Sequence, residues 1–327
     1  MAFRVPNFYL LLFSWLLNIS AITSVEPIAK PNCSTHCGAV EIPFPFGIGT
    51  GCYVENWFEI ICAKNDTVPL LRRANLEVSS IALAGTLNVR IPIAFANCSD
   101  KPNDDAARNS ADLTGSPFRY STRNRFTAVS CGAIALMSSS DGATIAGCLS
   151  ICGGGGGACM ALNKSCNGMG CCQTTIPSSL TAFNTTFRAI DGSDDHRQCK
   201  YAFLADQDWF ESRTTYISSV RKKSDVPVVL EWELRNSTSE VFGTNVKTNI
   251  SERDEYFSPG YFWDEDRDDT VGYVNSSCRS FVTPSSAAEN RSRLECRCPE
   301  GYSGNPYLEK GCRGKFLLNL YNMVKIN

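Results

Sequence analysis

The cysteine content constrains this chain more than any other feature of its sequence. The 327 residues include 17 cysteines. So many thiols are a liability in a reducing cytosol, whereas the secretory pathway oxidises them into structural disulfides. We therefore expect a disulfide-stapled extracellular protein, in which the odd count leaves one sulfur unpaired if every other one pairs. The predicted framework comprises Cys33, Cys37, Cys52, Cys62, Cys98, Cys131, Cys148, Cys152, Cys159, Cys166, Cys171, Cys172, Cys199, Cys278, Cys296, Cys298 and Cys312.

The first residues support the same compartment. One basic side chain, Arg4, precedes the apolar run from Phe8 to Leu17, and small or polar residues follow through Ser24. This order is typical of a secretory signal peptide, and the apolar run is shorter than the roughly 20 residues that cross a bilayer. We predict a signal peptide over residues 1–24 and a secreted, extracellular mature chain.

Potential N-glycosylation sites recur along the mature sequence. An Asn-x-Ser/Thr site accepts a glycan only on the surface of a secreted protein. The predicted acceptors are Asn32, Asn65, Asn97, Asn163, Asn184, Asn236, Asn249, Asn275 and Asn290.

The cysteines fall into groups that suggest modules. We expect a cysteine-rich domain over residues 33–98, and a β-rich middle region over 99–277 that contains a cysteine cluster at 131–199. A third cysteine group spans 278–312, and residues 313–327 form a tail without cysteine. The adjacent Cys171 and Cys172 are expected to pair with different partners, because a bridge between neighbours strains the backbone. Spacing alone leaves the remaining connectivity open.

The periodic signals predict mostly β structure. Apolar residues alternate from Leu87 to Phe95 and again from Val228 to Leu234, which is the period of a half-buried strand. Pro92 cannot donate to a strand ladder, so it predicts an edge strand or a bulge. Helical periodicity is weak nearly everywhere. The predicted fold class is a mostly β, disulfide-rich, multi-module extracellular protein.

Motifs for catalysis, metal binding or cofactor binding are weak. The glycine run from Gly153 to Gly157 lies between cysteines instead of between a strand and a helix, which argues against a dinucleotide site. The chain has only 2 histidines, and its cysteine spacing is irregular, so disulfides are favoured over zinc. Glu231 and Glu233 share a predicted strand face and could mimic a glycosidase pair, although a solvated face explains them equally well. We expect no catalytic residue, metal or cofactor.

Basic and aromatic residues suggest binding of an acidic ligand. The formal net charge of −2 provides no global basic field for nucleic acid, so a polyanion would need a local patch. Guanidinium groups pair bidentately with carboxylates, which suits an acidic sugar polymer. The candidate ligand-binding arginines are Arg72, Arg73, Arg90, Arg119, Arg123 and Arg125, with a further basic run at Arg221 to Lys223. The aromatic residues proposed to stack on sugar rings are Phe44, Phe46, Tyr53, Trp57 and Phe58.

Several motifs resemble the extracellular portion of plant wall-associated receptor kinases. The segment from Cys37 reads CGAVEIPFPFGIGTGC and is followed by WFEIIC, which is similar to the galacturonan-binding domain of that family. Further on, NRFTAVSCG, GCLSIC, GMGCCQTTIP and VVLEWEL resemble the region that follows it. CRCPEGYSGNPYLEKGC, over 296–312, is similar to the back half of an epidermal-growth-factor-like (EGF-like) repeat, so 278–312 is interpreted as a partial repeat.

The resemblance implies binding of pectin, specifically homogalacturonan or its oligomers, in the cell wall space. Family members continue into a membrane helix and a cytoplasmic kinase, whereas this chain ends in RGKFLLNLYNMVKIN. We therefore expect a released, kinase-less ectodomain that has no membrane span and binds without catalysis. Two alternatives remain: a protein-interaction module that binds a peptide or a partner receptor through the EGF-like segment, and a secreted hydrolase that uses Glu231 or Glu233.

Overall fold

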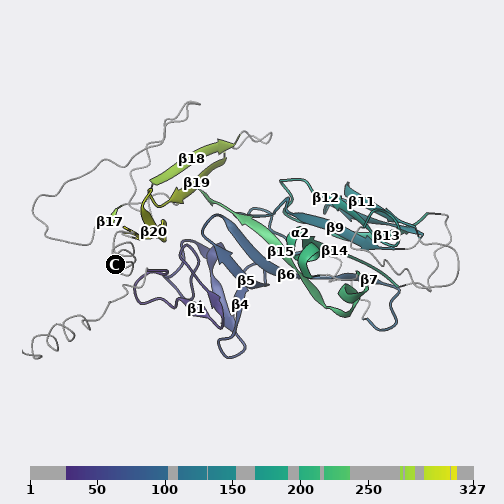
Figure 1. Cartoon of the computed structure of the whole chain (residues 1–327), viewed down its shortest axis with the longest axis horizontal. Coiled ribbons are helices and arrows are strands. Elements are labelled where there is room, and N and C mark those ends of the chain that lie inside the picture. Colours follow the sequence, from purple (N-terminus) through teal and green to yellow (C-terminus); the bar gives the residue numbers. More distant parts are fainter. Residues whose placement is uncertain are drawn as a thin grey trace, which may run out of the picture.

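A computed structural model of the chain describes the ranges 27–101, 110–130, 132–151, 166–190, 199–213, 217–235, 273–274, 277–283, 291–309 and 311–314 (Figure 1). Several predicted features lie outside these described residues. They are the signal peptide 1–24, the glycine run 153–157, the tail from 315 onward, Cys131, Cys152, Cys159, Asn163, Asn236, Asn249, Asn275 and Asn290. The side chain of Cys278 is likewise not described.

The largest sheet has six strands in the order β3-β4-β5-β6-β15-β8, all antiparallel to their neighbours. Its strands are β3 (Ile60–Ala63), β4 (Val68–Leu71), β5 (Leu76–Ala82), β6 (Thr86–Pro92), β15 (Asp225–Trp232) and β8 (Phe118–Tyr120). β15 enters this sheet from far along the chain and pairs with both β6 and β8. Residues 99–277 therefore supply two of the six strands, β8 and β15, to a sheet whose other four strands come from the N-terminal region.

The alternating segment 87–95 forms two strands instead of one. β6 ends at Pro92, and β7 (Ala94–Ala96) then joins a second sheet. The expectation of an edge strand is wrong, because β6 lies between β5 and β15, and the register shift in this ladder falls on β5, between Val78 and Ser80, instead of at Pro92. Pro92 is tolerated because it is the last residue of β6, where the chain passes from one sheet to the other.

A second pair of sheets lies beside the first (Figure 1). The four-stranded sheet has the order β12-β9-β14-β7, and the three-stranded sheet that contacts it has the order β11-β10-β13. Their remaining strands are β9 (Asn124–Val129), β10 (Ala133–Ser138), β11 (Thr144–Ser150), β12 (Cys172–Thr175), β13 (Asn184–Ala189) and β14 (Lys200–Asp206). The short helix α2 (Gln207–Arg213) and the 3-10 helix η3 (Ile217–Lys222) lead from β14 into β15. The prediction of a mostly β fold is confirmed.

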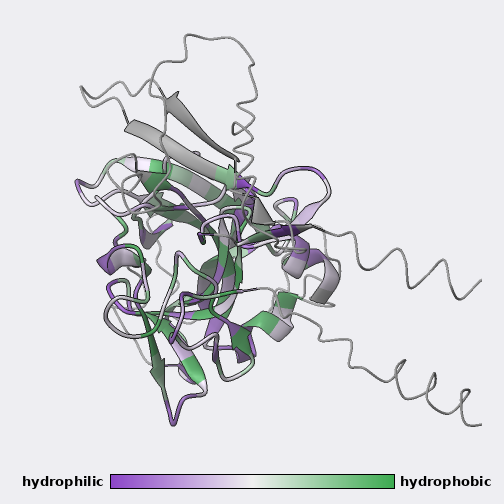
Figure 2. Ribbon diagram, turned by 90° about the vertical axis from the view of Figure 1, so that its left-hand side faces the viewer, coloured by the Kyte–Doolittle hydropathy of each residue, from purple (hydrophilic) through white to green (hydrophobic). Residues whose placement is uncertain are grey.

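One continuous core connects these layers. Its centre is an aromatic cluster in which Phe46 packs edge-on against Phe58 and Trp232, with ring centroids 4.9 and 5.5 Å apart. Such pairs add about 0.5–1.5 kcal/mol beyond the area they bury. Figure 2 shows hydrophobic segments along the inner strands and hydrophilic ones in the outer turns. Phe46 and Phe58 come from the N-terminal region and Trp232 from the end of β15, so the two regions share this core.

Two glycines explain the tight packing of the N-terminal motif. Its first hairpin pairs β1 (His36–Cys37) with β2 (Val40–Glu41), and η1 (Asn56–Phe58) precedes β3. Gly38 has a positive φ of 57°, and a Cβ atom there would stand 2.3 Å from the Thr67 carbonyl oxygen. A Cβ at Gly47 would stand 2.2 Å from the Cys52 carbonyl oxygen. Any side chain at either position would force the backbone apart.

Disulfides hold each region closed. The bridges are Cys33–Cys52, Cys37–Cys62, Cys98–Cys199, Cys148–Cys172, Cys166–Cys171 and Cys298–Cys312. Cys296 is also disulfide-bonded, and no cysteine is free in the part of the chain that the structure describes. Cys171 and Cys172 pair with different partners, as predicted from their adjacency. Cys98–Cys199 joins residues 101 positions apart and so links the N-terminal region to the middle region.

The C-terminal segment docks onto the N-terminal region. Two small sheets, β16-β19-β18 and β17-β21-β20, contain β16 (Leu234–Arg235), β17 (Tyr273–Val274), β18 (Ser277–Thr283), β19 (Arg291–Arg297), β20 (Tyr302–Gly304) and β21 (Cys312–Gly314). Asn305, which is 2% exposed, donates from Nδ2 to the carbonyls of Ile28 (2.8 Å) and Phe44 (2.7 Å). Tyr307 packs on Trp232 at 5.5 Å between ring centroids. The segment from Tyr302 to Cys312 is therefore seated on the core.

Replacing Asn305 tests this docking. Asn305→Ala removes the side-chain donor to the Ile28 and Phe44 carbonyls, of which the Ile28 carbonyl still accepts from the Phe44 N–H, and removes the Oδ1 acceptor of the Tyr307 N–H at 3.0 Å. We expect the free energy of unfolding to fall by about 2–4 kcal/mol, measured by chemical denaturation under non-reducing conditions. The exposed Asn56→Ala is the matched control and should change it by less than about 0.5 kcal/mol. Equal stability of the two variants would contradict the docking role.

Candidate functional site

Arg119 lies in the middle of a charged cluster on the outer face of the six-stranded sheet. In the register of β8 and β15 it stands opposite Glu231. Its guanidinium contacts Glu231 Oε2 at 2.9 Å and Glu233 Oε2 at 2.8 Å. Ser121 donates to Glu231 Oε1 at 2.7 Å. The prediction that the two glutamates share a strand face is confirmed, and one arginine holds both.

The charges of this cluster balance within the protein. Burial alone would lower the pKa of Arg119, but the hydrogen bond and charge of Glu233, together with Glu231, outweigh burial and raise it. The three side chains are only 22–30% exposed, so their attraction is screened less than that of a fully exposed pair. A guanidinium in this state has little capacity left for an external carboxylate, and both carboxylates are already engaged.

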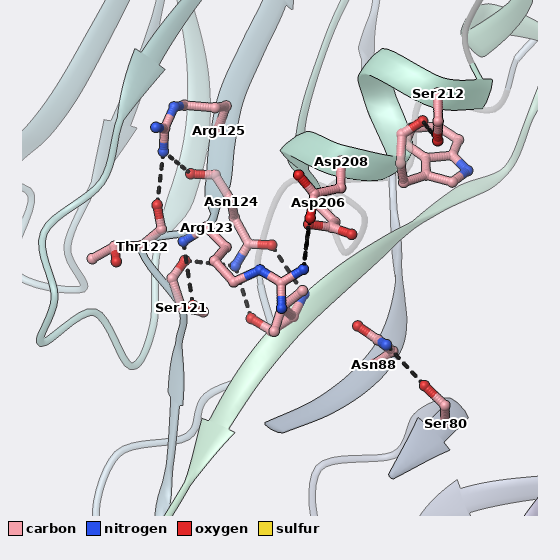
Figure 3. Close-up of polar contacts among 12 residues, drawn as sticks. Ser80, Asn88, Ser121, Thr122, Arg123, Asn124, Arg125, Asp206, Asp208 and Ser212 are labelled. Carbon is pink, nitrogen blue, oxygen red and sulfur yellow. Dashed lines mark hydrogen bonds and ion pairs between the residues drawn. The ribbon is translucent and has the colours of Figure 1, made fainter. Parts of the chain in front are cut away.

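Arg123 and Arg125 stand at the start of β9, where polar contacts are dense (Figure 3). Arg123 contacts Asp208 at 2.9 Å and Asp206 at 3.8 Å. Arg125 donates from Nη1 to the carbonyls of Thr122 (2.7 Å) and Asn124 (3.1 Å). No carboxylate pairs with Arg125 among the residues that the structure describes.

Two further basic residues, Arg90 and Arg221, are also paired. Arg90, on β6, forms an ion pair with Asp225 at the start of β15. Arg221 contacts Asp100 at 2.7 Å, and its hydrogen bond lowers the pKa of that carboxyl. These contacts tie distant parts of the chain together, which is a sufficient structural reason for the charges.

Arg72 and Arg73 occupy the turn between β4 and β5, at one corner of the N-terminal region. Arg72 pairs with Glu59 at 2.6 Å, while its own side chain remains 57% exposed. The Arg73 guanidinium lies over the Trp57 ring, 4.9 Å from the centroid. Arg73 is exposed and has no carboxylate partner among the described residues. Cation–π contact of this kind uses the flat face of the guanidinium and leaves its in-plane N–H donors available.

The six candidate arginines do not converge on one point. Arg90 and Arg119 share the outer face of the six-stranded sheet, Arg72 and Arg73 share a turn, and the other two lie on the neighbouring sheet. The stacking role expected for Phe44, Phe46 and Phe58 is wrong, because these rings are at most 2% exposed and belong to the core. Only the half-buried Tyr53 and Trp57 remain from that set.

Four predicted glycan acceptors fall among the described residues. Asn32 and Asn65 are exposed, whereas Asn97 and Asn184 are partly exposed. All four therefore reach the surface, and their occupancy stays a prediction. Within the described ranges no cluster of three or more metal-ligating side chains forms, and no helix there is long and apolar enough to cross a membrane.

The disulfides, the layered sheets and the self-paired surface charges define a disulfide-rich β protein of the extracellular ectodomain class. Family models described as wall-associated receptor kinase galacturonan-binding and as wall-associated kinase match residues 33–91 and 163–241. The chain belongs to the wall-associated kinase family and corresponds to its extracellular region.

Similar curated proteins from Arabidopsis thaliana support this assignment. Wall-associated receptor kinase-like 10 is 28% identical over 92% of this chain and 41% of its own length. Wall-associated receptor kinase-like 3 is 30% identical over 90% of this chain and 40% of its own length. Wall-associated receptor kinase 3 is 29% identical over 87% of this chain and 36% of its own length. The chain thus spans about two fifths of the length of these relatives. No solved structure matches it.

The Arg119 cluster gives a stability prediction. Arg119→Met leaves Glu231 and Glu233 adjacent and without their shared partner, so we expect the free energy of unfolding to fall by about 1–3 kcal/mol. Arg125→Met, which removes hydrogen bonds only to backbone carbonyls, is the matched control and should have a smaller effect. Chemical denaturation of both variants at pH 7 measures the difference. A larger loss for Arg125→Met would show that the cluster does not stabilise the sheet.

Proposed function

We propose that the chain binds galacturonan in the cell wall as a secreted ectodomain and that it does so without catalysis. The observation that carries this proposal is the match of residues 33–91 to the galacturonan-binding family model. The engagement of Glu231 and Glu233 by one guanidinium supports binding over hydrolysis, because neither carboxylate stands ready as a proton donor or a nucleophile.

Among the six candidate arginines, the contacts favour Arg73 as the principal ligand contact. Arg90, Arg119 and Arg123 each have carboxylate partners within the fold. A polyanion would have to displace those partners and leave the protein's own carboxylates unpaired, which costs free energy. Binding at Arg73 would leave no carboxylate of the described residues unpaired, and Trp57 restricts the motion of the Arg73 side chain. The Arg73 side chain therefore loses less conformational entropy when a ligand binds.

The neighbours of Arg73 extend this surface modestly. Arg72 is exposed beside it, and its guanidinium could pair with a galacturonate carboxylate while it keeps its contact with Glu59, and Trp57 offers aromatic area for a pyranose ring. Arg125 remains a secondary candidate because its described partners are neutral. A single cation gives weak attraction in water, so appreciable affinity requires a polymer that presents many equivalent carboxylates to the same site.

The experiment is binding of the secreted, oxidised protein to immobilised polygalacturonate across a salt series. Because an exposed charge is screened beyond about 8–10 Å at physiological ionic strength, we expect binding to weaken as salt rises and to disappear on fully methyl-esterified pectin. Arg73→Ala and Trp57→Ala should each weaken binding at least about fivefold, a loss near 1 kcal/mol.

Arg188→Ala is the matched control, because it removes an exposed arginine on β13 and changes the net charge equally. It should alter binding by less than about twofold, or 0.4 kcal/mol. Failure of the unaltered chain to bind at any salt concentration would refute the proposed function. Binding that responds equally to Arg73→Ala and Arg188→Ala would refute only the proposed site. Absence of new reducing ends during the assay tests the claim that no hydrolysis occurs.

A further inference from the structure

Large apolar side chains are exposed together at one end of the β11-β10-β13 sheet. Leu149 is 41% exposed, Ile151 57%, Met169 63% and Ile190 50%. These four residues, with the half-buried Ile134, are called the aliphatic patch. They include all but one of the large hydrophobic side chains that are exposed in the described part of the chain, the other being Ile61.

The strand register places the patch on a single face. Leu149 and Arg188 both stand opposite Ile134, on either side of β10. Side chains two residues apart on a strand point to the same side, so Ile151 follows Leu149 and Ile190 follows Arg188. The alternate residues Ala133, Ala135 and Met137 are 0% exposed and face the four-stranded sheet. The patch is therefore on the outer face.

A short disulfide loop fixes Met169 beside this face. Cys166–Cys171 closes the loop, and Ile151 and Met169 form a bridge between their backbones. The N–H of Ile151 donates to the Gly168 carbonyl at 2.8 Å, and the N–H of Gly170 donates to the Ile151 carbonyl at 2.9 Å. Gly168 and Gly170 both have positive φ, which permits this tight path. The loop thus holds an exposed thioether in a fixed place, which reduces the entropy lost on binding.

The charge pattern indicates what the patch could bind. Arg188 is the only charged residue among the described residues of β10, β11, β13 and 166–176, and no ion-pair partner for it is present in the described ranges. Aliphatic side chains with one cation that has no ion-pair partner among the described residues suit a protein segment that carries large apolar residues and a carboxylate. Sugar rings, in contrast, favour flat aromatic surfaces, and none of the five patch residues is aromatic.

We propose that the aliphatic patch is a docking site for a partner protein, which inserts large apolar side chains against Ile151 and Met169 and pairs a carboxylate with Arg188. The predicted glycan acceptor Asn184 lies on the same face of β13 but at the opposite end of the strand, next to Ser138. A glycan there would confine the contact to the patch. The proposal is independent of galacturonan binding, because it uses other residues on another sheet.

The test is selection of peptides from a random display library against the immobilised, oxidised chain. We expect enriched peptides to carry at least two large apolar residues and one Asp or Glu. Synthetic peptides with these sequences should bind the double variant Ile151→Ser, Met169→Ser at least tenfold more weakly. Arg188→Glu should weaken them similarly and should select basic peptides in a fresh round. Ile61→Ser, on β3, is the matched control and should leave binding unchanged.

Three outcomes would overturn the proposal. The first is that the library yields no enriched peptides, and the second is that the enriched peptides bind the parent chain and the double variant equally. The third is light scattering that shows the parent chain to be a dimer that the double variant dissociates, in which case a second copy of the chain covers the patch. Unchanged polygalacturonate binding and thermal unfolding of the double variant would show that any loss is local to the patch.

Discussion

The fold depends on the pairing of β15 with β6 and β8. Without β15, β6 would be an open edge, and the rings of Phe46 and Phe58 would lose Trp232, which closes their cluster. The register runs from Asp225 opposite Pro92 to Glu231 opposite Thr86, so the whole length of β6 is covered. Two segments that match separate family models, 33–91 and 163–241, therefore build one sheet and one core. The segment that matches the galacturonan-binding model therefore shares its sheet and its core with residues from the second matched segment.

This dependence explains which features the sequence could predict. Period-two alternation around Leu87 and Val228 identified two strands, because it reflects burial of one face and needs no knowledge of the partner strand. The pairing between them was not predictable, since it joins residues more than a hundred positions apart. For the same reason, the switch of sheets at Pro92 was missed. Local geometry alone showed that the adjacent Cys171 and Cys172 belong to different disulfides, and this prediction is confirmed. The other pairings depend on the fold and were therefore left open.

The candidate site shows the same limit more sharply. Arginine runs such as Arg119 to Arg125 look like free cationic patches in a sequence, yet Arg119 and Arg123 pair with carboxylates far along the chain. Arg119 reaches Glu231 across 112 positions, and Arg90 reaches Asp225 across 135. The sequence around Phe44 and Phe46 contains nothing that distinguishes exposed rings that stack on a sugar from rings buried in the core. Of the predicted ligand contacts, Trp57 and the Arg72–Arg73 turn are the aromatic and basic residues that lie together in the structure. The pairing of β3 with β4 brings them close to each other.

The two proposed surfaces lie on separate parts of a structure that has one continuous core. β4, beside the Arg73 turn, and β13, beside the aliphatic patch, are well apart along the long axis of the described structure (Figure 1). The core between them is continuous, and Cys98–Cys199 links the regions covalently. A carbohydrate at the turn would therefore leave the patch accessible to a protein, and neither ligand would have to displace the other. Binding at both surfaces could then tether a partner protein to the polymer through a single folded unit, with the avidity that a fixed separation provides.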